Sequence, residues 1–451
     1  MHRHTTVPAL AAALLGCLLA LGAGPAVAQA AGEVEFSRGV GFAQSAGQAP
    51  RTLGKGLELQ EGDRLTTSEG ASAIIKLHDG TRMTVRPNSE LVLQQYRFRE
   101  SAPDNSMLMQ LVRGGFRAVT GLISKGSPNA ARVQTSTATI GIRGTAFDAR
   151  LCVRECGVES SRVIEQARPN AVLASAKVVQ SQGELYAVDA NGVRRRVVDG
   201  GSIYPGDVVE TAAGSRGVIA FRDDSRITLG PSTRFRIDNF VYDEQNAGDG
   251  RFLASLLRGS VRALTGLIAK ANNRNVGFAT ATATIGIRGT GFDMACPGEC
   301  TEGNLTLYTW LGAISYQRTG QTALELLQAG QGLLVTPTGV LPINNQPDVD
   351  GPRPDGVNVP PKLFAKEDVS DAKEGLFVFV RDGHIEVATA TEVLHLGRGE
   401  AGFAAPEGGT ARPFTIPKFI DFDRLPMPTA TNPLLLTVLA DNAIRPANTC
   451  K

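Results

Sequence analysis

An Arg-Gly-Thr tripeptide that occurs twice is the strongest candidate in this sequence for a chemically active group. The two copies are Arg143-Gly144-Thr145 and Arg288-Gly289-Thr290. Each guanidinium could clamp an anionic ligand or a partner's carboxylate through paired hydrogen bonds. The alternative is a structural corner, in which the glycine makes a tight turn and the arginine satisfies exposed carbonyls. We expect the structural corner, because glycine and polar residues at turns usually serve backbone needs.

Two Cys-x3-Cys pairs follow the two copies of this motif. The pairs are Cys152 with Cys156 and Cys296 with Cys300, and Cys450 is left over. In an oxidising compartment such pairs form disulfides more often than metal sites. A redox-active pair would have Cys-x2-Cys spacing at a helix start. We therefore expect two structural disulfides, each pinning a turn just after the motif.

Other catalytic or metal-binding patterns are weak. His78, His384 and His395 lie on distant segments, so no zinc site is expected. Asp348 and Asp350 resemble part of a calcium loop that lacks its final glutamate. The sequence contains neither a nucleophile elbow with a histidine partner nor a phosphate-binding glycine loop. These observations predict a protein that is not an enzyme and that has no catalytic residue, no metal and no cofactor.

Tyr308 and Trp310 form a small aromatic group that allows two interpretations. They could stack against a sugar, or they could fill one face of a sheet. We expect core packing.

An internal duplication organises the chain. Ser136–Asp148 returns as Ala281–Asp293, and Leu111–Lys125 returns as Leu256–Lys270. The spacing between the copies slips by only one residue along their length, and the cysteine pairs keep it. A match of this length indicates two tandem copies of one domain.

Short apolar alternations around turns predict that the domains are all-β. Ser72–Leu77 and Met83–Val85 flank an Asp-Gly turn, and the second copy repeats this hairpin. Val112 to Ile123 has helical spacing in both copies, but Gly114-Gly115 disfavours a helix, so we expect a strand. Residues 376–396 contain a third, weaker set of hairpins, with turns expected at Asp382-Gly383.

The N-terminal residues predict export. Arg3 precedes an apolar run, and small residues at Ala28 and Ala30 offer cleavage sites, as in a secretory signal peptide. An uncleaved signal anchor and lipidation at Cys17 are the alternatives. No other stretch is long and apolar enough to span a bilayer, so we expect a periplasmic, secreted or cell-surface protein with no membrane span after cleavage. The net charge of +2 gives no reason to expect nucleic acid as a partner.

These features predict five segments. They are a signal peptide at 1–30, a first domain at 31–160, a second domain at 175–340, a Pro/Asp/Gly linker at 341–362 that does not pack, and a C-terminal β-hairpin segment with a tail at 363–451.

The Gly-Asp before a strand, the Asp-Gly hairpin and the Arg-Gly-Thr-x-Phe ending together resemble the FecR family. The resemblance covers about 33–148 and 183–335. It implies all-β, solenoid-like or sandwich-like periplasmic domains, which in well-known members sense an iron-siderophore transporter and control a sigma factor. Only seven residues precede the apolar run here, so we expect no cytoplasmic anti-sigma segment.

The sequence therefore predicts a non-enzymatic binding module for an envelope protein or polymer. The alternatives are a periplasmic sensor that signals through a separate membrane partner and a structural scaffold of the envelope.

Overall fold

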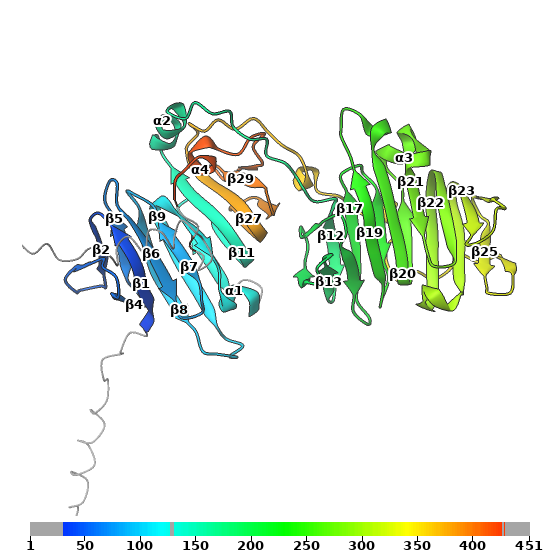
Figure 1. The fold of residues 1–451 in the computed structure, drawn as a ribbon, viewed down its shortest axis with the longest axis horizontal. Coiled ribbons are helices and arrows are strands. Elements are labelled where there is room, and N and C mark those ends of the chain that lie inside the picture. Colours follow the sequence, from blue (N-terminus) through cyan, green and yellow to red (C-terminus); the bar gives the residue numbers. More distant parts are fainter. Residues whose placement is uncertain (1–29, 127–129, 426–427, 429–451) are drawn as a thin grey trace, which may run out of the picture.

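The chain folds into two sheets of strands joined by long connecting segments (Figure 1). The computed structural model describes residues 30–126, 130–425 and 428. The expected signal peptide, Cys17 and Cys450 lie outside the described residues. The prediction of an all-β fold built from two copies of one domain is confirmed.

The first sheet has 15 strands. Eleven come from the N-terminal part: β1 (Ala30–Arg38), β2 (Gly41–Gln44), β3 (Arg51–Thr52), β4 (Glu58–Gln60), β5 (Arg64–Thr67), β6 (Ser72–Leu77), β7 (Arg82–Val85), β8 (Glu90–Arg97), β9 (Ser106–Val119), β10 (Ala131–Gln134) and β11 (Thr139–Cys152). Four come from the C-terminal part: β27 (Gly375–Ala388), β28 (Val393–Gly397), β29 (Ala401–Ala404) and β30 (Thr410–Ala411).

The second sheet also has 15 strands, and they are consecutive in sequence. They are β12 (Ala176–Gln182), β13 (Leu185–Val188), β14 (Arg194–Val197), β15 (Ser202–Ile203), β16 (Val208–Thr211), β17 (Arg216–Phe221), β18 (Arg226–Leu229), β19 (Arg234–Val241), β20 (Arg251–Leu264), β21 (Val276–Ala279), β22 (Ala283–Glu299), β23 (Leu305–Arg318), β24 (Glu325–Gln328), β25 (Gly332–Val335) and β26 (Val340–Ile343). The α-helices are short: α1 (Leu122–Gly126), α2 (Glu155–Ser161), α3 (Leu267–Ala271) and α4 (Lys418–Asp421).

The two sheets have the same strand order, but the first is completed from the far end of the chain. The central path of the first runs β8-β9-β10-β11-β27, and that of the second runs β19-β20-β21-β22-β23. Strand β27 thus takes the place that β23 has in the second copy. Residues 363–425, which the sequence analysis set apart as a C-terminal segment, supply the last strands of the first sheet. The second sheet is an insertion between β11 and β27.

Each sheet encloses its own apolar core. In the first, Phe116 and Phe147 meet edge to face, with 5.5 Å between ring centroids. In the second, Phe252, Phe278 and Phe292 form a chain of similar contacts. Alternate residues of each strand point into these cores, which is why period-two patterns located the strands correctly.

The hairpin of β6 and β7 and its counterpart β17 and β18 are present as predicted. The segment with helical spacing is the long strand β9 in the first copy and β20 in the second, and only its last residues enter α1 or α3. The expected turn at Asp382-Gly383 is wrong, because β27 continues through it. The expected core position of Trp310 is also wrong, because Leu307 and Thr309 take the inward positions of β23.

The expectation that 341–362 does not pack is wrong as well. Val349 is only 1% exposed. Gln346 Nε2 donates to Asp293 Oδ2 at 2.7 Å, and Thr228 Oγ1 donates to the Pro352 carbonyl at 2.7 Å. The segment needs no core of its own because its carbonyls and a few apolar side chains pack on the face of a sheet that is already formed.

Candidate functional site

Both Arg-Gly-Thr motifs form a bulge in the middle of a long strand. Gly144 has φ +57° and Gly289 has φ +66°, which are left-handed conformations that favour glycine. The register of β11 against β27 shifts between Arg143 and Ala146, and β22 shifts against β23 at the same place. The bulge bends both strands over the core, so the motif shapes the sheet.

The partner strands also need glycine at this point. A Cβ on Gly383 would lie 2.5 Å from the Gly144 carbonyl oxygen, and a Cβ on Gly312 would lie 2.5 Å from that of Gly289. Sequence reasoning connected neither glycine with the motif, and it assigned Gly383 to a turn. The signal that identifies them is positional, since each lies opposite a motif glycine.

The motif threonines are fixed by a threonine at the end of β9 or β20. The Thr145 N–H donates to Thr120 Oγ1 at 2.8 Å, and the Thr290 N–H donates to Thr265 Oγ1 at 3.0 Å. The Thr120 hydroxyl donates in turn to the Thr145 carbonyl, and the Thr265 hydroxyl donates to the Thr290 carbonyl. The two corners lie in different sheets and are built alike.

The two motif arginines differ in their surroundings. Arg143 Nη2 donates to Glu386 Oε1 on β27 at 2.9 Å. Arg288 is exposed, and the part of the chain that the structure describes gives its side chain no hydrogen bond or ion pair. Neither guanidinium caps a backbone carbonyl, so that expectation is wrong. Arg288 is a free cation at the surface of the second sheet.

The aspartate that ends each motif is fully buried, and sequence reasoning missed its role. Asp148 Oδ1 accepts from Arg117 Nε, and its Oδ2 accepts from Arg381 Nε, both at 2.7 Å. Asp293 accepts from Arg262 Nε at 2.9 Å and from Trp310 Nε1 at 3.1 Å. Burial lowers the pKa of Arg117, and the charge of Asp148 opposes that shift. The repeated Phe-Asp ending of the motif was the available signal.

A segment that follows the last strand of each sheet contacts the group around the buried aspartate. In the first sheet Asp423 pairs with Arg86 and Arg117 beside Asp148. In the second sheet Gln346 takes the corresponding place beside Asp293. These aspartates therefore anchor the long segments to the sheets.

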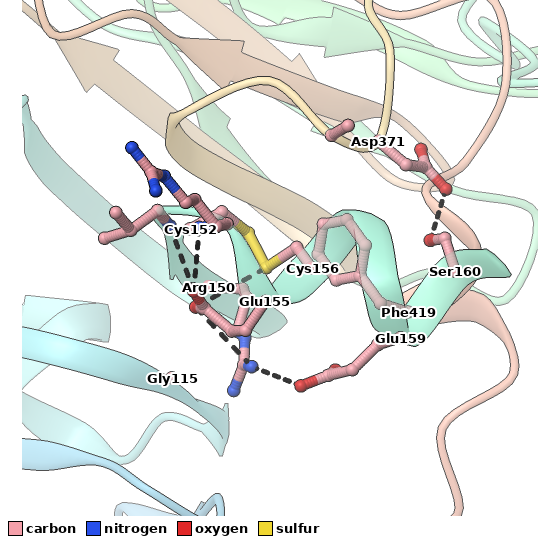
Figure 2. The surroundings of a disulfide bond; sticks show 12 residues. Gly115, Arg150, Cys152, Glu155, Cys156, Glu159, Ser160, Asp371 and Phe419 are labelled. Carbon is pink, nitrogen blue, oxygen red and sulfur yellow. Dashed lines mark hydrogen bonds and ion pairs between the residues drawn. A yellow bond between two sulfur atoms is a disulfide. The ribbon is translucent and has the colours of Figure 1, made fainter. Parts of the chain in front are cut away.

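Both cysteine pairs are disulfides in the structure, Cys152–Cys156 and Cys296–Cys300. Figure 2 shows the first, which fixes the start of α2 directly after β11. Phe419 of α4 lies beside it in a small apolar cluster, and Ser160 Oγ donates to Asp371 Oδ2 at 2.6 Å. The bridge thus holds the point at which the chain leaves the first sheet.

The outer faces beside the two corners carry different side chains. In the first sheet this face holds Arg143 on β11, His384 and Glu386 on β27, and His395 on β28, with Glu386 opposite His395. In the second sheet the corresponding positions are Arg288, Ala313, Ser315 and Leu326. We call these the first and second outer faces.

The second sheet's first strands cover the first outer face. Gly200 lies so close to the His395 ring that a Cβ there would be 2.0 Å from it. The Arg398 N–H donates to Tyr204 Oη at 2.9 Å, and Lys177 Nζ donates to the His395 carbonyl at 3.1 Å. The second outer face has no such cover among the described residues, and its Leu326 is 49% exposed.

A buried ion triad holds this junction together. Lys177 Nζ and Arg412 Nε donate to Glu400 Oε2 at 2.9 and 2.8 Å, and all three side chains are fully buried. Burial lowers the pKa of Lys177 to about 8, against the attraction of Glu400. Burial alone would raise the pKa of Glu400, but the charges of Lys177 and Arg412 lower it.

No described helix is long and apolar enough to cross a membrane.

Comparison with solved structures gives only a distant likeness. Two crystal structures of one protein from Parabacteroides distasonis ATCC 8503, described as a "putative anti-sigma factor", match with 14% identity and a TM-score of 0.25. Each match covers 31% of this chain and 60% of that one. A likeness this weak carries no argument. No curated protein matches the sequence.

A family model described as FecR protein matches residues 63–163 and 207–308. Each match runs from the Gly-Asp before β5 or β16 through the corner and its aspartate, so it covers the same elements in both sheets. The chain therefore carries two FecR domains, the second inserted into the sheet of the first.

Proposed function

We propose that this chain is an exported, non-enzymatic envelope protein that binds another protein through its second outer face. The observation that carries the proposal is the contrast between the two copies. The first outer face is covered by the second sheet, whereas the second presents a free guanidinium and the exposed Leu326.

The chemistry of the second outer face suits a protein ligand. Leu311 and Leu326 are 50% and 49% exposed, and they lie on neighbouring strands next to the β22 corner. Arg288 adds a planar donor that pairs well with a carboxylate. An apolar segment carrying one acidic side chain would match this combination.

Variants of the second outer face test this proposal. Wild type, Arg288→Ala and Leu326→Ser should be compared by crosslinking and pull-down from an envelope fraction. We expect one protein partner that both variants lose. Arg143→Ala is the matched control, because the Arg143 guanidinium already forms an ion pair with Glu386. Equal capture by all four proteins, or capture only of isolated peptidoglycan, would contradict the proposal and favour the scaffold.

Export is a separate part of the proposal. The small residues at Ala28 and Ala30, together with two disulfides, support an extracytoplasmic location. N-terminal sequencing of protein from the periplasmic fraction should find a start just after one of these residues. An intact Met1 in the membrane pellet would contradict cleavage and favour a signal anchor.

A sensor role is the second candidate, and the two FecR domains favour it. It predicts that the captured partner is a membrane protein. A partner without any membrane segment would count against signalling across the envelope.

A further inference from the structure

The first outer face brings together two histidines and a glutamate that lie apart in sequence. His384 and Glu386 point to the same side of β27, and His395 lies opposite Glu386 on β28. One ligand atom from each residue lies within 4.8 Å of the other two. Sequence reasoning treated the histidines as scattered, because the pairing of the two strands was not known.

The distances suit a single metal ion. His384 Nε2 and His395 Nδ1 are 3.4 Å apart. Two nitrogens that each bind Zn²⁺ at about 2.0–2.1 Å in a tetrahedron are separated by roughly 3.3 Å. Glu386 Oε1 lies 3.9 Å from His395 Nδ1, so the carboxylate lies within reach of an ion held by the two nitrogens.

Neighbouring groups orient the ligands. Arg143 donates to Glu386 Oε1 at 2.9 Å and fixes the carboxylate, while the described residues give Glu386 Oε2 no hydrogen bond. Gly200 packs against the His395 ring, where any larger residue would displace it. Such outer contacts set the orientation of metal ligands. The positive charges of Arg143 and Lys177 work against a cation, so moderate affinity is expected.

We propose that His384, Glu386 and His395 form a site for one divalent transition-metal ion of the Zn²⁺ type, at the junction of the two FecR domains. Two nitrogens and one oxygen leave a fourth position for water or for a ligand. The second copy has Ala313, Ser315 and Leu326 at the corresponding positions, so only the first copy has the ligands.

Zn²⁺ binding to the full-length chain tests the site. Competition with a chromophoric chelator should show one tight equivalent, and Co²⁺ should give the visible absorption of a tetrahedral site. His384→Ala and His395→Leu should each weaken binding at least about 100-fold, and Glu386→Ser about 10-fold or more. Leucine and serine are the residues that the second copy has at these positions.

Controls separate loss of ligands from loss of fold. His78→Ala removes an exposed histidine elsewhere and should leave binding unchanged. Glu386→Gln keeps the size of the side chain, so it serves if Glu386→Ser fails to fold. Absence of binding to the folded wild type when Zn²⁺ is in large excess over the protein would overturn the proposal. Binding that survives both histidine substitutions would do the same and would implicate the N-terminal His2 and His4.

Discussion

The corner glycine of the second domain gives the sharpest test of the fold argument. Gly289 has φ +66°, and no atom lies within 4 Å of the place where a Cβ would be. A substitution there therefore costs only backbone strain. Alanine in this conformation costs about 1–2 kcal/mol, and a β-branched residue costs more. For a domain of this size the loss from Gly289→Ala corresponds to a Tm lower by roughly 2–8 °C. Calorimetry of the full-length chain would measure it.

Two further substitutions separate strain from other effects. Gly289→Asn should recover most of the loss, because asparagine tolerates left-handed backbone better than other residues. Gly339→Ala is the matched control, since Gly339 has open space around it and no positive φ. Gly289→Val should be the least stable of the series. If Gly289→Val has the same Tm as Gly339→Ala, or if Gly289→Asn lowers the Tm as much as Gly289→Val, the bulge does not depend on the left-handed conformation.

Three other predictions follow from the buried and paired groups. Asp148→Ala leaves Arg117 and Arg381 without their buried carboxylate, so it should lower the free energy of urea unfolding by about 3 kcal/mol. Asp355→Ala removes an exposed ion pair and should lower that free energy by less than about 1 kcal/mol. Peptide mapping without reductant should find Cys152–Cys156 and Cys296–Cys300 with Cys450 as the free thiol, and four reactive thiols in fresh periplasmic protein would contradict this. The pKa of Glu400 is lowered in the folded protein, so its stabilising contribution is complete above about pH 4.5 and is lost as the pH falls through the folded pKa. The free energy of urea unfolding should therefore depend less on pH in this acidic range for Glu400→Gln than for the wild type. An unchanged pH profile would refute this.

Local patterns in the sequence predicted many of the strands and turns because neighbouring residues determine where these elements form. Alternating apolar residues placed the β6–β7 hairpin, and repetition of the motif placed the two corners. The bulge was missed because Gly383 and Gly312 contribute to it from a different strand, and an isolated glycine resembles a turn.

The pairings that join distant segments were beyond local patterns. Residues 376–396 show the two-residue alternation that is typical of strands, but no local sequence pattern indicates that they pair with β11. The cluster of His384, Glu386 and His395 depends on a hairpin whose register is fixed by burial of Ile385 and Leu394. Asp148 was not recognised as a buried anchor because its partners Arg117 and Arg381 come from two other segments, and Asp423, which shares Arg117, comes from a third.

The place of the insertion explains why the two copies differ. Cys152 at the end of β11 lies opposite Gly375 at the start of β27, so the chain leaves and re-enters the first sheet at neighbouring points. In the second copy the same two strands, β22 and β23, are joined by a short turn that contains Cys300. Insertion is tolerated where the two ends lie close together at the edge of a domain.

An insertion at this point keeps the second domain beside the strands it interrupts. Strand β12 follows the connecting segment, and its Lys177 donates to the His395 carbonyl of β28 and pairs with Glu400 in the turn after that strand. The first outer face is therefore enclosed by the chain itself, and its Glu386 pairs with Arg143. No domain follows β26 to enclose the second outer face in the same way among the described residues, because the chain returns to the first sheet. One duplicated surface is thus buried at the junction, whereas the other remains exposed among the described residues.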